Sequence, residues 1–208
     1  SMRIADDLSG VESSTYGEAV EMRLAAMVEI LLMAPIRRGN LARLDLERHL
    51  AWPVQADGEM RLSIPAAEVK NRVALEYFLP PPSTSLLRTY VERFRPLLIR
   101  TPTSALFPGE ADGCMSPNSV GRIIRLGLQR HLGVAFNAHL FRHFACMNHL
   151  RLYPGDYETP RRLCGHKRLQ TLVDHYAGME TEAAVRRFHE GTVLRIRQTV
   201  DGMRDDEL

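Results

Sequence analysis

The chain contains 208 residues, of which 45% are hydrophobic and 25% are charged, an ordinary composition for one globular domain with a single core. No apolar run approaches the roughly 18 residues that would cross a membrane, and no secretory signal is visible. The three cysteines, Cys114, Cys146 and Cys164, are odd in number and lack C-x-x-C spacing. They argue against a disulfide or zinc framework, and together these features predict a cytoplasmic protein without a membrane partner.

The net charge of +2 does not by itself indicate a nucleic-acid partner. The basic residues are nearly all arginine, and the only lysines are Lys70 and Lys167. Arginine suits bidentate contact with phosphate, but a GC-rich genome also favours arginine codons. The composition therefore carries little weight in the argument for function.

The N-terminal part of the chain predicts a flexible segment followed by a long helix. Residues 1–14 are polar, and Ser1-Met2 resembles a cloning remnant, which predicts a further protein segment upstream. Thr15-Tyr-Gly-Glu18 has the pattern of a capping box and opens an amphipathic helix that reaches Leu32. Pro35 interrupts this pattern, and Leu41–Leu44 resume a short helical turn.

The next segment predicts a small antiparallel sheet. Short strands are expected at residues 51–55, 60–64 and 72–78, because β-formers alternate there between turn signals. Asp57-Gly58 indicates a hairpin turn between the first two strands. The connection to the third strand, residues 68–71, places Lys70 at the tip of a loop.

The remainder of the chain predicts helices. Ser83 or Ser85 caps the first of them, and Ser116-Pro117 begins the next as an N-cap followed by proline. After the first helix, a loop covers residues 100–115, and the later helices are expected at 117–132, 138–152, 157–164, 168–176 and 182–200. An acidic tail, residues 201–208, ends the chain. The fold class is mostly α with a small three-stranded antiparallel β-sheet.

The segment from His139 to Tyr176 concentrates residues that handle phosphate groups. His139 and Arg142 are three positions apart, so on a helix they can grip one anion together. Gly165 places His166 on a turn that permits close backbone approach. Tyr176, beside such cations, is a candidate nucleophile toward phosphorus. This pattern predicts chemistry on a nucleic-acid backbone.

In chain order, these motifs resemble the catalytic domain of the tyrosine recombinases, the phage-integrase family. An arginine after the first long helix, a lysine in a β-hairpin, His-x-x-Arg, Leu-x-Gly-His and a tyrosine follow one another over residues 15–190. The resemblance implies one catalytic domain, residues 15–200, from a phage or mobile element. It implies a catalytic set made of Arg37, Lys70, His139, Arg142, His166 and Tyr176.

The resemblance also implies the role of each residue. Tyr176 would attack a scissile phosphate and form a 3′-phosphotyrosine, with Lys70 as general acid for the leaving 5′-oxygen. Arg37 and Arg142 would neutralise charge on the phosphate, and His166 would donate a hydrogen bond to it. His139 would accept the tyrosine proton or bind the phosphate. Asn40 stands where the family carries glutamate, which weakens any inference about how Arg37 is oriented.

The implied partners are double-stranded DNA and, in the full-length protein, further copies that form a tetramer on DNA. No metal or other cofactor is implied, and no set of carboxylates suggests a two-metal site. The helix expected at 182–200 has an apolar stripe that predicts either docking on a neighbouring protomer or packing on its own core.

Several alternatives remain open from the sequence. Tyr157 is the main rival nucleophile, and His175 competes with His166. His143 is expected to point away from His139 and Arg142 and to act in packing or behind the site. The chain is alternatively a type IB topoisomerase-like enzyme, or a catalytically silent DNA-binding or assembly module of the same fold.

Overall fold

The structure is a computed structural model and describes residues 1–4, 15–55, 57–109 and 113–170, together with the single residues 173, 176, 185, 189 and 191. Of the helix expected at 168–176, residues 168–170, 173 and 176 are described, whereas of the helix expected at 182–200 only residues 185, 189 and 191 are. The tail at 201–208 lies outside the described residues. None of the described helices is both long enough and apolar enough to cross a membrane.

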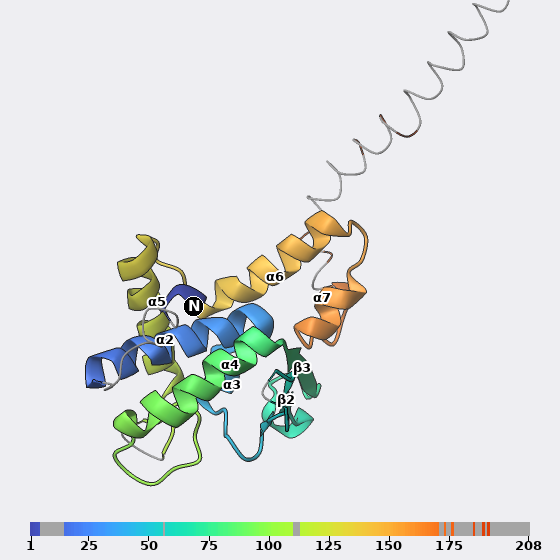
Figure 1. The fold of residues 1–208 in the computed structure, drawn as a ribbon. Helices are drawn as coiled ribbons and strands as arrows, with labels where there is room; N and C mark the ends of the chain where they lie inside the picture. Colours follow the sequence, from blue (N-terminus) through green and yellow to red (C-terminus); the bar gives the residue numbers. More distant parts are fainter. Residues whose placement is uncertain are drawn as a thin grey trace, which may run out of the picture.

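Helix α2 (Tyr16–Met33) forms the centre of the fold. The predicted capping box is confirmed, because the Thr15 side chain accepts from the Glu18 backbone N–H while the Glu18 carboxylate accepts from the Thr15 backbone N–H. Ten consecutive or near-consecutive residues between Ala19 and Leu31 are buried, so α2 is covered on several sides. Figure 1 shows α4, α5 and α6 arranged around it.

The sheet has three antiparallel strands in the order β1-β2-β3: β1 (Leu50–Ala51), β2 (Met60–Ile64) and β3 (Leu75–Leu79). The predicted sheet is therefore confirmed, with shorter first and third strands. The first strand ends before Pro53, which cannot donate to a ladder. The third begins later than predicted because Arg72 has φ +54°, a left-handed conformation that breaks extended backbone.

Helix α4 (Pro81–Thr89) corrects the predicted cap. Its N-cap is Pro80 and it begins with prolines, which lack the N–H groups that an N-terminal turn leaves unpaired. Ser83 is instead buried inside the helix, where its hydroxyl donates to the Glu29 carboxylate at 2.5 Å. The helix continues as a π-helical turn, η2 (Tyr90–Phe94), and a 3₁₀ turn, η3 (Arg95–Leu98).

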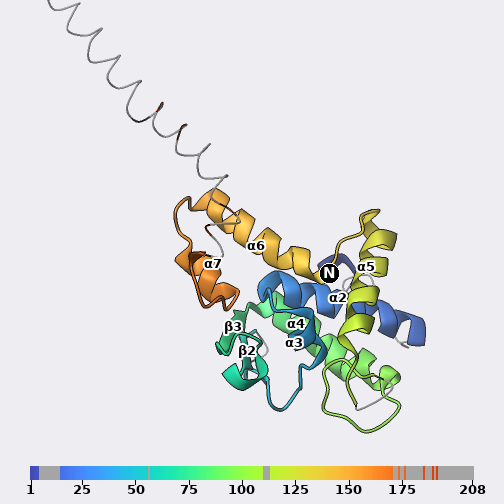
Figure 2. The same ribbon diagram turned by 180° about the vertical axis from the view of Figure 1, so that it is seen from behind.

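Helices α5 (Pro117–Leu132), α6 (Ala138–Leu152) and α7 (Glu158–Leu163) complete the described fold. The predicted Ser116 cap is confirmed by its bond from the Ser119 backbone N–H at 3.0 Å. Helix α5 lies close to α2 at Gly127, where an added Cβ would meet Leu24 Cδ2 at 2.2 Å. Seen from either side, α7 and the sheet share one end of the molecule (Figures 1 and 2).

Candidate active site

Helix α6 carries three polar side chains of the site, namely His139, Arg142 and His143. The Asn137 side chain caps the helix by accepting from the backbone N–H groups of His139 and Leu140 at 2.9 and 3.1 Å. Phe141 packs into the main core beside α2. This packing and the cap hold the first turn of α6, so the three polar residues project from a rigid element.

Arg142 is buried and holds two segments of backbone together. Its Nη1 donates to the Pro35 carbonyl at 2.5 Å, and its Nη2 donates to the Cys164 carbonyl at 2.7 Å. Nη2 also lies 3.1 Å from Nε2 of His166. No carboxylate among the described residues pairs with this guanidinium, so its charge is oriented but not neutralised. Such a buried cation attracts an anion strongly.

Arg37 lies near Arg142 and adds a second positive charge that pairs with no carboxylate of a described residue. It is the N-cap of the short helix α3 (Arg38–Ala42), and its Nη1 is buried with no hydrogen-bond partner among the described residues. Burial, and then the charge of Arg142, lower the pKa of Arg37. Two neighbouring guanidinium groups, with no carboxylate of a described residue between them, form a site suited to an anion that both groups can contact.

Gly165 and His166 form a tight turn after α7. Gly165 has φ +60°, and an added Cβ there would meet Leu75 Cδ2 at 2.6 Å, so the position requires glycine. The backbone N–H of His166 donates to the Arg161 carbonyl at 2.9 Å, and Arg161 Nη1 donates back to the His166 carbonyl at 3.0 Å. This turn holds the His166 ring against Arg142.

His139 and His143 lie on the same face of α6, with ring centroids 4.7 Å apart in an edge-to-face arrangement. Burial, then the charges of His143, Arg142 and Arg37, lower the pKa of His139. Burial, together with the cations of the site, therefore favours the neutral form of His139 near pH 7. The expectation that His143 points away from this group was wrong, because residues four apart on a helix share a face.

Tyr176 reaches the site through His143. Its hydroxyl lies 2.6 Å from Nδ1 of His143, and the side chain is 7% exposed. Burial, and then the neighbouring thiols of Cys146 and Cys164, raise the pKa of Tyr176 to about 12, against the opposite effect of Arg142. The phenol is thus protonated at neutral pH and needs a base. The i, i+4 spacing from His139 was the signal that could have placed His143 beside the candidate site.

Lys70 lies at the edge of the site, on the predicted loop between β2 and β3. It is exposed and forms no hydrogen bond or ion pair with another described residue. Its neighbour Asn71 donates through Nδ2 to the Gly165 carbonyl at 2.9 Å. The loop therefore adjoins the turn of His166, while the Lys70 ammonium itself extends into solvent.

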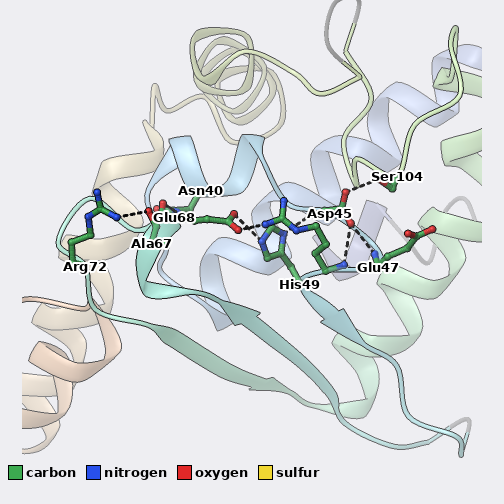
Figure 3. Close-up of polar contacts among 9 residues, drawn as sticks. Asn40, Asp45, Glu47, His49, Ala67, Glu68, Arg72 and Ser104 are labelled. Carbon is green, nitrogen blue, oxygen red and sulfur yellow. Dashed lines mark hydrogen bonds and ion pairs between the residues drawn. The ribbon is translucent and has the colours of Figure 1, made fainter.

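Figure 3 shows what holds the other side of this loop. Asn40 of α3, three residues after Arg37, donates through Nδ2 to the Glu68 carbonyl at 3.1 Å. The Glu68 carboxylate contacts Nε2 of the buried His49 at 3.1 Å and pairs with Arg48, while Arg72 Nη1 donates to the Ala67 carbonyl at 3.2 Å. Asn40 thus links the segment of Arg37 to the loop of Lys70.

The remaining sequence candidates have clear positions or lie outside the described residues. Tyr157 is buried beside Tyr176 in a small cluster that also contains Cys146, Leu150 and Cys164. His175 lies outside the described residues. Within the part of the chain that the structure describes, no group of three His, Cys, Asp or Glu side chains could hold a metal ion.

No family model matches the chain, and no curated protein matches it by sequence. Solved structures do match. XerA recombinase superimposes with a TM-score of 0.59 at 16% identity, over 88% of this chain and 67% of that one. XerH site-specific recombinase, bound to its difH substrate before cleavage, gives 0.58 at 18% identity. The chain has the tyrosine recombinase fold.

A third structure, the Tn1549 transposon integrase in complex with a circular intermediate DNA, gives a TM-score of 0.56 at 14% identity over 89% of this chain. The recombinase-fold chain covers 46% of the XerH structure and 62% of the integrase structure, so it spans about half to two thirds of these proteins. The resemblance drawn from the motifs is thereby confirmed for the fold.

Proposed function

We propose that the chain is the catalytic domain of a site-specific DNA recombinase or integrase that cuts and rejoins DNA through Tyr176. The observation that carries this proposal is the pair Arg37 and Arg142, two adjacent guanidinium groups without a carboxylate among the described residues. They leave a site for one dianionic or developing dianionic group, and Tyr176 is held beside it through His143. A phosphodiester passing through a phosphorane is such a group.

In the proposed cleavage step, the Tyr176 oxygen attacks the scissile phosphorus while His143 takes the phenolic proton. The bond from phosphorus to the 5′-oxygen breaks, and Lys70 gives that oxygen a proton, which produces a free 5′-hydroxyl. Rejoining reverses the step, because a 5′-hydroxyl attacks the phosphotyrosine and releases the phenol. One phosphodiester bond is exchanged for another, so no nucleotide hydrolysis is needed.

The cations bind the phosphate during both steps. Arg142 and Arg37 each bind a non-bridging oxygen, and His166 adds a hydrogen bond from the same side. His139, neutral because its pKa is lowered, acts as a hydrogen-bond donor to the phosphate. Lys70 is exposed on a loop anchored at both ends, so the DNA would bring the leaving oxygen to it.

Two adjoining basic cavities support double-stranded DNA as the partner. One, of about 540 Å³, lies between Arg38, Arg122, Arg125 and His139, and it therefore borders the candidate active site. The second, of about 680 Å³, shares Arg122 and adds Arg23, Arg43 and Arg100. No described residue lining either cavity is acidic. Arginines grouped in this way suit the phosphate backbone of a duplex.

Assembly into a tetramer on two duplexes belongs to the same proposal, for a protein that contains this domain. This part of the proposal rests only on the tyrosine recombinase fold of the chain.

The test is a cleavage assay in the presence of EDTA, since the proposal assigns charge neutralisation to arginines. A DNA duplex nicked next to the scissile phosphate traps the covalent intermediate, because the released short strand diffuses away. We expect a protein–DNA adduct that migrates slowly on a denaturing gel and is digested by protease. Mass spectrometry of the adduct should place the nucleotide on Tyr176.

Tyr176→Phe should abolish the adduct, whereas Tyr157→Phe, in the same cluster, should retain it. An adduct that persists in Tyr176→Phe would contradict the proposal. DNA binding without any adduct across candidate attachment sites would favour a silent module. Relaxation of supercoiled DNA without exchange between two duplexes would favour a topoisomerase.

A further inference from the structure

Two buried thiols lie between the elements that build the candidate active site. Cys146 is on α6, one turn after Arg142, and Cys164 is the C-cap of α7, immediately before the turn of Gly165 and His166. Their sulfur atoms are 3.6 Å apart, and the two residues are 2% and 0% exposed. Both are free thiols. The pair therefore bridges the helix of His139 and Arg142 and the turn of His166.

We propose that Cys146 and Cys164 form a reversible disulfide when a small peroxide oxidises them, and that this bond switches off DNA cleavage. Formation of the bond stands on the geometry of the two sulfurs alone. Its effect on cleavage rests on the proposed function of the site.

The surroundings make Cys164 the sulfur that reacts first. The hydrogen bond from Cys146, together with the charges of Arg142 and Arg37, lowers the pKa of Cys164 against the effect of burial. The same hydrogen bond raises the pKa of Cys146, which keeps its proton. The thiolate is the nucleophilic form of cysteine, so a thiolate at Cys164 with a thiol at Cys146 is an attacking sulfur beside a resolving one.

The chemistry balances with one molecule of hydrogen peroxide. The Cys164 thiolate attacks one peroxide oxygen, the O–O bond breaks, and a sulfenic acid forms at Cys164. The other oxygen leaves as hydroxide, and it becomes water by taking up the proton that the Cys164 thiol had released. The Cys146 sulfur then attacks the Cys164 sulfur, the S–O bond breaks, and a second water leaves with the Cys146 proton. Two thiols and one peroxide become one disulfide and two waters, and the two electrons pass from the sulfurs to the peroxide.

The burial of the pair determines the class of oxidant. A disulfide reagent such as oxidised glutathione needs to bring its own sulfur into line with the attacking thiolate. Sulfurs that are almost completely covered by protein do not offer that approach. Hydrogen peroxide is small and uncharged, and it carries the reactive O–O bond in a molecule little larger than water.

The disulfide would disturb the site because its sulfurs are bonded at about 2.05 Å, so the present 3.6 Å separation must shrink by about 1.5 Å. The Cys164 carbonyl accepts from Arg142 at 2.7 Å, and the next two residues form the turn that carries His166. Cys146 also lies in the same buried cluster as Tyr176, so a shift of its sulfur would disturb the packing around the tyrosine. A displacement of about 1 Å in an organised site costs roughly 10- to 100-fold in rate.

The first experiment tests the bond itself. The 208-residue chain with Cys114→Ser, which removes the third thiol, is treated with hydrogen peroxide and digested with trypsin without reduction. Trypsin cuts after Arg151, Arg161 and Arg162, so the two cysteines leave on separate peptides unless a disulfide joins them. We expect a joined peptide pair that disappears after dithiothreitol. Thiols that stay reduced, or sulfinic acid at Cys164 without a joined pair, would overturn the proposal.

The second experiment tests the switch with the covalent-adduct assay on nicked DNA. Peroxide should lower the adduct yield roughly 10- to 100-fold in the Cys114→Ser protein, and dithiothreitol should restore it. Cys146→Ala in the same background cannot form the bond, and its adduct yield, compared with its own untreated form, should not fall in this way. An equal and reversible loss in that variant would refute the switch. If the untreated protein forms no adduct, the proposed function fails, while the joined peptide still tests the disulfide.

Oxidised glutathione provides the comparison that tests the class of oxidant. At concentrations that oxidise an exposed thiol, it should leave the Cys146–Cys164 pair reduced. A joined peptide pair that forms as fast with glutathione as with peroxide would contradict the argument from burial.

Discussion

Nδ1 of His143 lies 2.6 Å from the hydroxyl of Tyr176, which joins the helix of the arginine site to the residue that would attack DNA. The His143 ring also contacts His139 edge to face. The three rings form a row that leads from the phosphate-binding residues to the phenol. A proton leaving the phenol therefore has a nearby acceptor whose position is set by α6.

His143→Gln should lower the rate of covalent adduct formation by about 10²-fold, the usual contribution of a positioned general base. The glutamine can keep a hydrogen bond to the phenol but cannot take its proton. His149→Gln is the matched control on the same helix, because His149 pairs with Asp156 instead of the site. If both variants keep the rate of the parent protein, His143 is not the base.

Arg142→Lys should lower the rate of covalent adduct formation by at least about 10²-fold. The variant should also unfold at a lower temperature. A lysine cannot reproduce the fork that contacts the carbonyls of Pro35 and Cys164. Leaving one such buried acceptor unpaired costs about 1–3 kcal/mol. Arg130→Lys, at an exposed pair with Glu21, should change the unfolding free energy by less than about 0.5 kcal/mol. Equal effects of the two substitutions, measured by denaturant unfolding, would refute this role for Arg142.

The Tyr176 hydroxyl should make stability depend on pH in the alkaline range. Its pKa is raised from 10 in the unfolded chain to about 12 in the fold, so the folded state holds its proton more tightly. This contribution is complete below pH 10 and is lost as the pH rises toward 12. Between pH 10 and pH 12 the unfolding free energy of the parent protein should therefore fall further than that of Tyr176→Phe. The difference between the two losses should be on the order of 2 kcal/mol. Parallel pH profiles of the unfolding free energy would contradict the raised pKa.

Gly165→Ala should destabilise the fold by about 1–3 kcal/mol, because it forces a side chain into a left-handed backbone conformation. The added Cβ would also meet Leu75 Cδ2 at 2.6 Å. Since this turn carries His166, adduct formation should fall along with stability. Gly17→Ala, near the start of α2 where the nearest atom to an added Cβ is 3.9 Å away, should be neutral or slightly stabilising. Thermal unfolding of both variants checks the contrast.

Replacing Arg122 and Arg125 with glutamine should weaken DNA binding uniformly across sequences. Each lost phosphate contact should reduce the slope of log affinity against log salt by about 1. Arg130→Gln is the control on the same helix, because its charge is already paired with Glu21. Fluorescence anisotropy of a labelled duplex at several salt concentrations gives the slopes. An unchanged slope in the double variant would remove these cavities from the DNA-binding surface.

The sequence alone predicted the features that depend on side chains close together along the chain. The Thr15–Glu18 capping box and the Ser116-Pro117 start of α5 appear as predicted, because each depends on side chains within one turn of the helix end. The alternation of β2 appears in its burial pattern as well. The predicted serine cap of α4 was wrong because burial of Ser83 against Glu29, a contact between distant segments, outweighed its capping preference.

The order of motifs from Arg37 to Tyr176 determined the family resemblance without any structure, since it depends only on residue types and their spacing. Only the tertiary structure decided how these residues meet. Asn40 and Asn71 anchor the Lys70 loop to segments 28 and 94 residues away, and His143 reaches Tyr176 across 33. Such contacts depend on how the helices and the sheet pack, which periodicity along one segment does not contain. The proximity of Cys146 and Cys164 arises in the same way.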